Sequence, residues 1–277
     1  LLMDCDTTGI EPDYALVKFK KLAGGGYFKI VNQCVPRALT KLGYSKTETE
    51  EILRYILGTN RLHGAPEIND TSLRTKGLTD EDLAKIERAL PGVLELQYAF
   101  SPWVLGEETL LRLGFAPEQY KTEGFDLLRA FGFTAEQVEQ ANRHICGSLT
   151  IEGAPHLREE HLPVFDCASK CGKYGRRFLA PMAHIKMMAA VQPFLSGAIS
   201  KTINLPNDTA AEEIEQLYVD SWHRGLKAVA LYRDGCKKSQ PITTSTESQK
   251  GEEAEEVHAV IEPALVRRRL PSKRQGF

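Results

Sequence analysis

The sequence has little of what a membrane protein or a secreted protein needs. Only six cysteines occur in 277 residues, at irregular spacing, and this pattern suits a reducing cytoplasm better than a disulfide framework. No apolar run approaches the roughly 18 residues of a membrane span, and the first residues are acidic, whereas a secretory signal begins with basic ones. We therefore predict a cytoplasmic protein that has no membrane partner.

An excess of charge of either sign is also missing. Lysine and arginine number 35 and aspartate and glutamate 37, a formal net charge of −2, so bulk electrostatics draw the chain neither to nucleic acid nor to a membrane surface. Hydrophobic residues make up 42% of the sequence, which is enough for a sizeable core in one large domain or two small ones. Because Leu1 is not an initiator methionine, we expect a fragment.

The stretch from residue 182 to residue 204 is the most informative part of the chain. Residues 182–191 are apolar at helical spacing and predict a buried helix. Residues 198–204 instead place a polar trio between two β-branched apolar residues, which predicts a short strand: Ser200, Lys201 and Thr202 between Ile199 and Ile203. Such a strand either carries working groups at the end of a sheet or barrel, or is an ordinary strand whose polar side chains are solvated.

A helix and a second strand should follow this first strand. Asp208 or Thr209 can cap a helix over 210–224. Because the connection is too long for a hairpin, we expect strands 198–204 and 227–232 to run parallel in one sheet that is covered on both faces. The helix should bury one apolar stripe against them, made of Ile214, Leu217, Tyr218 and Trp222.

Three consecutive glycines mark the N-terminal part. Two β-rich runs, 15–21 and 27–31, flank Gly24, Gly25 and Gly26, which predicts a hairpin or a connecting turn. A phosphate cradle is the alternative, but no Gly-Lys-Ser/Thr sequence and no helix start follow the glycines. A helix is expected next, over about 35–42.

Residues 43–147 contain a weak internal repeat, in which a glycine turn follows an apolar helix end. Ser45, Thr79 and Thr134 stand where a helix N-cap belongs, and acidic residues follow in the next turn. A helix-hairpin-helix module that grips nucleic-acid phosphates is one interpretation. The acidic first turns would repel phosphate, however, and favour a plain helical insertion.

Residues 150–181 are rich in loops and hold a set of potential zinc ligands: His156, His161, Cys167 and Cys171. The Cys-x3-Cys spacing is looser than that of a zinc-binding Cys-x2-Cys pair, and no second pair follows. Cys167 and Cys171 are thus weak metal candidates, and a redox disulfide or simple structural thiols are the other interpretations.

Two runs near the end of the chain carry a family resemblance: Ile199-Ser-Lys-Thr-Ile-Asn-Leu-Pro206 and Gly225-Leu-Lys-Ala-Val-Ala-Leu-Tyr-Arg-Asp-Gly235. They closely resemble the end of the catalytic barrel of adenosylcobalamin-dependent (class II) ribonucleotide reductases. Residues 1–14 look like the segment that follows the substrate-phosphate loop of this family, so Leu1 and Leu2 would lie at the edge of that loop. Residues 23–32 also match, and the resemblance covers about residues 1–240.

The resemblance implies an α/β fold, namely the C-terminal portion of a ten-stranded α/β barrel over residues 1–240. Residues 43–181 would then be a helical and loop-rich insertion. Residues 241–262 are rich in Ser, Thr and Glu, which predicts a disordered linker, mobile and without a stable element over residues 242–262. Residues 263–277 look like the start of a truncated C-terminal module, or alternatively a basic tail.

The resemblance also implies a chemistry: conversion of ribonucleotides, in the first place diphosphates, to deoxyribonucleotides for DNA synthesis, with adenosylcobalamin as cofactor. In this family the cobalt–carbon bond is homolysed and the radical passes to a cysteine, whose thiyl takes the ribose 3′-hydrogen. A cysteine pair then supplies electrons for loss of the 2′-hydroxyl. In the family pattern these cysteines precede Leu1, so no catalytic residue is assigned here.

The same resemblance sets the remaining expectations. The implied partners are a ribonucleotide substrate, a thioredoxin-like or dithiol reductant, nucleotide effectors and a second subunit in a homodimer.

Di-iron relatives use two adjacent tyrosines near the last barrel strand, whereas Leu231 precedes Tyr232 here, which favours the cobalamin class. Ser200 and Thr202 are the candidates for lining the substrate or cofactor cavity, because the charge of Lys201 is costly to bury unpaired. The alternative function is a non-enzymatic helical nucleic-acid-binding module.

Overall fold

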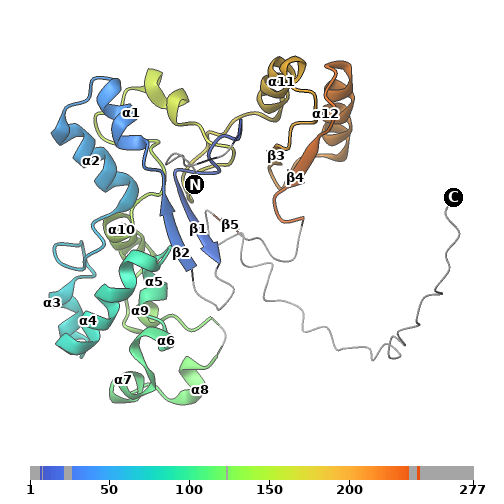
Figure 1. Ribbon diagram of the computed structural model, residues 1–277. Coiled ribbons are helices and arrows are strands. Elements are labelled where there is room, and N and C mark those ends of the chain that lie inside the picture. Colours follow the sequence, from blue (N-terminus) through green and yellow to red (C-terminus); the bar gives the residue numbers. More distant parts are fainter. Residues whose placement is uncertain (1–6, 8, 22–26, 123, 237–241, 244–277) are drawn as a thin grey trace, which may run out of the picture.

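The computed structural model describes residues 7, 9–21, 27–122, 124–236 and 242–243. It has a mixed helical and sheet character (Figure 1), with most helices on one side of a small antiparallel sheet and a second, smaller group of elements on the other. Within the described ranges, no helix has both the length and the apolar character needed to cross a membrane.

The antiparallel sheet holds the N-terminal part together. Strands β1 (Val17–Lys21) and β2 (Tyr27–Val31) pair from Val17↔Val31 to Lys21↔Tyr27, which confirms the two predicted strands. The glycines between them lie outside the described residues. Strand β5 (Ile242–Thr243) pairs with the free edge of β1. The prediction that residues from 242 onward carry no stable element is therefore wrong for these two, because an open strand edge offers backbone partners.

Helices make up most of residues 35–145. They are α1 (Val35–Lys41), α2 (Lys46–Leu57), α3 (Asp70–Thr75), α4 (Asp80–Ala89), α5 (Leu96–Ala99), α6 (Pro102–Leu105), α7 (Glu107–Arg112), α8 (Pro117–Tyr120), α9 (Leu127–Ala130) and α10 (Ala135–Ile145), with the 3-10 turn η2 (Leu90–Gly92). Ser45, Thr79 and Thr134 each accept a hydrogen bond from the backbone N–H three residues later, and the side chain of that residue bonds back to the cap. The predicted capping is thus confirmed.

These helices pack around two separate apolar clusters. Residues 62–146 form one cluster, in which Phe100, Leu73 and Ile86 are fully buried. The other cluster combines residues from 15–57 and 149–171 with Leu94, and includes side chains of α2 and of the 3-10 turn η3 (Glu159–Phe165). The helical lobe with its own core, residues 62–146, is therefore narrower than the predicted insertion over 43–181.

The chain enters and leaves this helical lobe through one close backbone crossing. Thr59 N–H donates to His144 O at 2.9 Å and Asn60 N–H to Ile145 O at 2.8 Å. Gly58 and Gly147 have φ values of +70° and +85°, and a Cβ on Gly58 would lie 2.2 Å from Ile145 O. Glycine is required at both positions, since a side chain would separate the two backbones.

The smaller group of elements is a parallel strand–helix–strand unit. Helix α11 (Pro181–Val191) and the 3-10 turn η4 (Gln192–Phe194) lead to β3 (Thr202–Leu205), α12 (Ala211–His223) and β4 (Ala230–Arg233). Strands β3 and β4 pair in parallel from Thr202↔Ala230 to Leu205↔Arg233. The predicted parallel pair and its connecting helix are confirmed, although β3 begins at Thr202 rather than at residue 198.

Part of the predicted burial in this unit is wrong. Leu217 is buried and Ile214 partly buried against the strands, but Tyr218 and Trp222 are 50% and 74% exposed. Ser221 is buried instead and donates to Leu217 O at 2.6 Å, so α12 presents a face that is rotated relative to the predicted stripe. Strand β4 is exposed or half-buried along its length, because within the described residues it is an edge strand with β3 as its neighbour.

The glycine crossing gives a first testable prediction. Replacing Gly58 by alanine should lower the free energy of unfolding by about 3 kcal/mol, because the new Cβ meets a backbone oxygen and the residue is held at positive φ. Gly64→Ala is the matched control, with a φ of +76° and open space around the added Cβ, and should cost about 1 kcal/mol. Urea denaturation measures both changes, and equal losses in the two variants would contradict the proposed role of the crossing.

Candidate functional site

A buried lysine joins three distant segments of the chain. Lys201 lies immediately before β3, His184 lies in the first half of α11, and Glu11 belongs to the irregular segment that precedes β1. Lys201 and His184 are each 3% exposed. Burying an ammonium group is unfavourable unless partners replace its water, so the contacts of Lys201 decide whether this arrangement can exist.

The ammonium group of Lys201 has such partners. Its Nζ donates to Glu11 Oε2 at 3.3 Å, to the Thr202 carbonyl at 3.0 Å and to His184 Nδ1 at 2.6 Å. The other oxygen of Glu11, Oε1, accepts the backbone N–H of Thr202 at 2.9 Å. All three hydrogens of an ammonium group are therefore satisfied. Glu11 is held through both of its oxygens, one on Lys201 and the other on Thr202, the first residue of β3.

The electrostatics keep His184 neutral. Burial lowers the pKa of His184, and the adjacent positive charge of Lys201 lowers it further. Because Nδ1 accepts from Lys201, we assign the imidazole proton to Nε2, an atom that is shielded from solvent. Burial also lowers the pKa of Lys201, and the carboxylate of Glu11 opposes that shift. The cluster is thus a charged pair with a neutral hydrogen-bond acceptor beside it.

A second network fixes the residues that follow Glu11. Asp13 Oδ1 accepts hydrogen bonds from Lys18 Nζ and from the backbone N–H of Tyr14, and Asp13 Oδ2 accepts one from Asn32 Nδ2 at 2.7 Å. Lys18 is largely buried and lies in β1, while Asn32 directly follows β2. The segment around residues 11–14 is consequently held at both of its acidic side chains.

The structure places the sequence-predicted site residues unevenly. Ser200 is exposed and Thr202 is half-buried. Lys201, which we did not expect to line a cavity because an unpaired charge is costly to bury, is the most deeply buried of the trio. Lys201 is not buried unpaired, because Glu11 supplies a partner from 190 positions earlier in the chain. The cavity-lining role of Ser200 and Thr202 stays a prediction, and Leu1 and Leu2 lie outside the described residues.

Sequence reasoning missed Glu11 and His184. Glu11 lies in the run that carried the family resemblance, yet no local pattern links it to Lys201. His184 lies within the apolar helix α11, where a histidine has no distinguishing spacing. A signal for either residue could come only from knowing which segments meet in three dimensions.

The four potential zinc ligands do not meet. His156 Nε2 contacts Glu51, and His161 Nδ1 lies 2.7 Å from the hydroxyl of Tyr44. The thiol of Cys167 donates to Phe165 O at 3.5 Å, and that of Cys171 to Ser169 O at 4.0 Å. In the described part of the chain, no group of three or more metal-ligating side chains is positioned to hold an ion.

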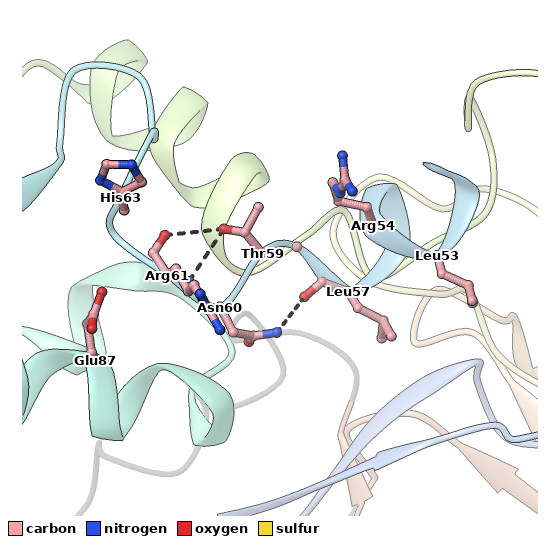
Figure 2. A pocket seen from close by; sticks show the side chains of 9 residues that line it. Leu53, Arg54, Leu57, Thr59, Asn60, Arg61, His63 and Glu87 are labelled. Atoms are coloured by element: carbon pink, nitrogen blue, oxygen red, sulfur yellow. Dashed lines mark hydrogen bonds between the residues drawn. The ribbon is translucent and has the colours of Figure 1, made fainter. Parts of the chain in front are cut away.

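A hollow lies elsewhere, beside the loop that enters the helical lobe. It has a volume of about 930 Å³ and is lined by Leu53, Arg54, Leu57, Gly58, Thr59, Asn60, Arg61, His63 and Glu87 (Figure 2). Thr59 and Asn60 turn their side chains back to the backbone, with Arg61 N–H donating to Thr59 Oγ1 and Asn60 Nδ2 donating to Leu57 O. These lining groups stabilise the loop itself.

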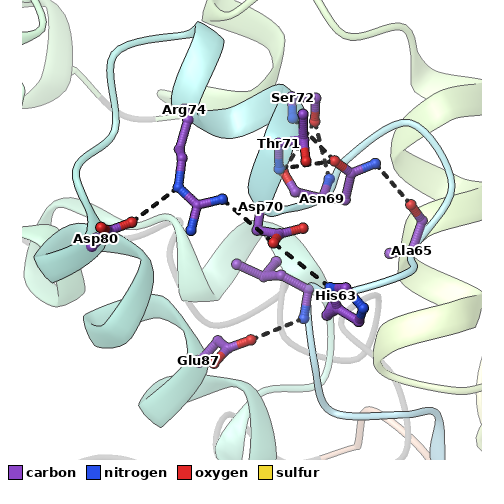
Figure 3. Close-up of polar contacts among 10 residues, drawn as sticks. His63, Ala65, Asn69, Asp70, Thr71, Ser72, Arg74, Asp80 and Glu87 are labelled. Carbon is purple, nitrogen blue, oxygen red and sulfur yellow. Dashed lines mark hydrogen bonds and ion pairs between the residues drawn. The ribbon is translucent and has the colours of Figure 1, made fainter.

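Polar groups next to this hollow are likewise engaged in structural contacts. Figure 3 shows Arg74 bridging Asp70 and Asp80, and Asp70 also lies 3.7 Å from His63. Asn69 and Ser72 form the capping box of α3, and Glu87 accepts the Leu62 N–H at 3.4 Å. The hollow therefore lies between α2, the loop that follows it and α4, whereas the buried Lys201 cluster is built from other elements.

Comparison with known proteins identifies the class of this fold. The family model described as "Ribonucleotide reductase, barrel domain" matches residues 1–75 and 118–232. The chain therefore belongs to the ribonucleotide reductase barrel-domain family. The matched ranges contain Glu11, His184 and Lys201, and they leave out residues 76–117, which span α4 to α7 of the helical lobe.

Individual relatives agree with the family. A vitamin B12-dependent ribonucleotide reductase of Bradyrhizobium diazoefficiens is 54% identical over 269 residues, which is 97% of this chain and 22% of the relative. Relatives of the same name from Agrobacterium fabrum and Streptantibioticus cattleyicolor are 48% and 37% identical over 100% of this chain, which is 23% and 31% of their own lengths. The chain thus spans between about a fifth and a third of these relatives.

The buried pair predicts an asymmetric response to mutation. Glu11→Gln should lower the free energy of unfolding by about 3 kcal/mol, because it leaves a buried ammonium without its counter-charge. Lys201→Met should cost less, about 1 kcal/mol, because the carboxylate of Glu11 is 31% exposed and can take up water.

The surface pair of Lys46 and Glu50, at 91% and 59% side-chain exposure, supplies the control for this comparison. Lys46→Met should change the free energy of unfolding by less than about 0.5 kcal/mol. Chemical denaturation at neutral pH measures the free energy of unfolding of all three variants. If Lys46→Met lowered it as much as Glu11→Gln does, the buried-pair assignment would be contradicted.

The lowered pKa of His184 predicts a pH dependence of stability. Its folded-state pKa lies below the ordinary value of 6.5, so the unfolded chain binds this proton more readily. The contribution of His184 should be fully present above about pH 6.5 and should be lost as the pH falls toward its folded pKa, with a slope of at most about 1.4 kcal/mol per pH unit. Denaturation of wild type and His184→Gln across this range tests the prediction, and parallel curves for the two proteins would refute it.

Proposed function

We propose that this chain forms the C-terminal part of the catalytic barrel of a ribonucleotide reductase. The whole enzyme would convert ribonucleotides, specifically diphosphates, to deoxyribonucleotides for DNA synthesis by radical chemistry that starts from adenosylcobalamin. The observation that carries this proposal is the 54% identity over 97% of the chain to a relative named as a vitamin B12-dependent ribonucleotide reductase. The substrate level and the adenosyl form of the cofactor rest on the sequence resemblance.

The fold supports a barrel assignment. A parallel strand–helix–strand unit such as β3–α12–β4 is the repeating element of α/β barrels, and the exposed edge of β4 leaves room for a further strand. We propose that residues 1–240 contribute to a ten-stranded barrel, with the insertion inside 43–181. Residues 241–262 would link it to a C-terminal module that begins at 263.

Within that barrel the Lys201 cluster has a positioning role. It fixes Glu11 to β3, and therefore fixes the segment that would lead out of the substrate-phosphate loop at Leu1 and Leu2. A phosphate loop binds its ligand only if its backbone groups are held in place. Fixing the segment that follows the loop would therefore support substrate binding. Ser200 and Thr202, on either side of Lys201, are the proposed cavity-lining residues.

The Lys201 cluster does not by itself fit a cobalamin. Imidazole is a common ligand of transition metals, but Nδ1 of His184 is bonded to Lys201 and Nε2 is enclosed by protein. His184 therefore has no nitrogen to offer to a docked cobalt. When bound, the cofactor would supply the initiating radical, and we assign its contacts to parts of the protein other than this cluster.

The proposal includes the partners that such a reaction needs. Each turnover consumes a ribonucleotide and two electrons, so a thioredoxin-like protein or a small dithiol must restore the reduced enzyme. Nucleotide effectors, a homodimeric assembly and a cytoplasmic location complete the proposal. The nucleic-acid-binding alternative is disfavoured, because the capped helices carry Glu48, Asp80 and Glu136 in their first turns and so repel phosphate.

Activity of the intact protein tests the function. With adenosylcobalamin and dithiothreitol it should form deoxyribonucleotide, faster from diphosphates than from triphosphates, and without the cofactor it should form none. The isolated 277-residue chain should be inactive under the same conditions, because the cysteines required for the chemistry are expected upstream. Chromatographic detection of product decides the matter, and either an inactive intact protein or an active isolated chain would overturn the proposal.

A further inference from the structure

The hollow of Figure 2 adjoins a second one at the stem of the helical lobe. The second hollow has a volume of about 320 Å³ and shares Arg54 and Thr59 with the first. Both lie beside the backbone crossing, because the Thr59 N–H donates to the carbonyl of His144, which also lines the second hollow. The first, at about 930 Å³, has a volume within the range of about 300–1,000 Å³ that is usual for small-molecule and cofactor sites.

Two arginines of the first hollow are free to bind a ligand. Arg54 belongs to α2 and Arg61 to the loop that follows it, and both are exposed. Neither guanidinium group forms an ion pair or a hydrogen bond with the described part of the chain. The arginine of the second hollow differs in this respect, since Arg143 pairs with Glu139 at 3.2 Å and lies 4.1 Å from the centre of the Tyr174 ring.

The first hollow carries a net positive charge. Glu87 is the acidic residue among its lining side chains, and Glu87 accepts the Leu62 N–H at 3.4 Å. Two unpaired guanidinium groups thus face one carboxylate that has a partner. Guanidinium binds phosphate through parallel N–H···O bonds and keeps its charge at any physiological pH, so the ligand that fits this lining best is a phosphate-bearing anion.

The same hollow also offers apolar surface. Leu53 and Leu57 lie one helical turn apart on α2, on either side of Arg54 in the sequence, and both line the hollow. Each is partly buried against the second apolar cluster, which fixes its position. Two leucines beside free arginines suit a ligand that combines a flat apolar ring with phosphate groups.

We propose that this hollow binds a nucleoside phosphate, with its phosphate groups on Arg54 and Arg61 and its base against Leu53 and Leu57. The ligand would lie between α2, which packs in the second cluster, and α4, which packs in the core of the lobe. It would therefore hold the two sides of the crossing together. This inference goes beyond the proposed function and does not depend on it, because none of these residues belongs to the Lys201 cluster.

Photolabelling of the intact protein with 8-azidoadenosine triphosphate tests the site, even if other parts of the protein also bind nucleotides. After irradiation and digestion with trypsin, we expect label on the peptides of residues 47–54 and 55–61, which carry Leu53 and Leu57. Excess adenosine triphosphate should abolish the label, tripolyphosphate should compete more weakly, and adenosine should not compete. Equal competition by tripolyphosphate and adenosine triphosphate would indicate a site for phosphate alone and would overturn the role of the leucines.

Substitutions at the exposed arginines test the charge. Arg54→Met and Arg61→Met should each raise the half-saturating concentration by about tenfold, with the label then measured over residues 47–61 or 55–74, because each change removes a trypsin site. Arg37→Met is the matched control, since Arg37 is exposed on α1 and lines neither hollow, and it should alter the concentration by less than about twofold.

Glu87→Gln should act in the opposite direction and lower the half-saturating concentration by about twofold or more, because it removes the negative charge from the lining. A purely structural role of these side chains would not move the affinity in opposite directions. The inference is overturned if residues 47–61 carry no label, or if Arg54→Met and Arg61→Met leave the half-saturating concentration unchanged.

Amide hydrogen exchange provides a readout that is independent of the photochemistry. The N–H groups of Thr59 and Asn60, which donate to His144 O and Ile145 O at the crossing, should exchange more slowly in the presence of saturating adenosine triphosphate. Arg61→Met should abolish this protection at the same nucleotide concentration, whereas Arg37→Met should retain it. Equal exchange rates with and without the nucleotide in the wild-type protein would refute the proposed link between the ligand and the crossing.

Discussion

The structure depends on the pairing of a buried ammonium with a carboxylate from the other end of the chain. Lys201 would be too costly to bury alone, and it is buried because Glu11, His184 and the Thr202 carbonyl together accept its three hydrogens. Glu11 in turn accepts the backbone N–H of Thr202. One ion pair therefore fixes where the N-terminal segment meets β3, and with it how the strand–helix–strand unit sits against the residues that precede β1.

Residues 11–16 are held from three directions, and this explains why so irregular a segment is ordered. Glu11 is bound to β3, Asp13 is bound to Lys18 and Asn32 at the ends of the antiparallel pair, and the loop carrying Cys167 and Cys171 bonds to the backbone of Asp13 and Tyr14. Irregular backbone must find its hydrogen-bond partners outside regular secondary structure.

The helical lobe joins this framework through a close backbone crossing. Its entry and its exit meet where Gly58 and Gly147 cross, with backbone atoms too close to admit a side chain. The lobe has its own apolar core over residues 62–146, and the part that the family model does not match, 76–117, lies wholly within it. Leu94, within that unmatched part, packs in the second apolar cluster, so the lobe also contacts the rest of the chain through this side chain.

The sequence by itself determined the local features of this protein. Capping residues, the strands around the glycines and the parallel pair with its helix follow from patterns within 15 to 35 residues, and the long runs near residues 1–14 and 199–235 pointed to the family. The tertiary structure decided which face of α12 is buried, which member of the Ser200–Lys201–Thr202 trio is interior, and which residues accompany it. The reason is physical: the cost of burying a charge or an aromatic ring depends on what meets it in space, and Glu11 and His184 find their partners only once the chain has folded.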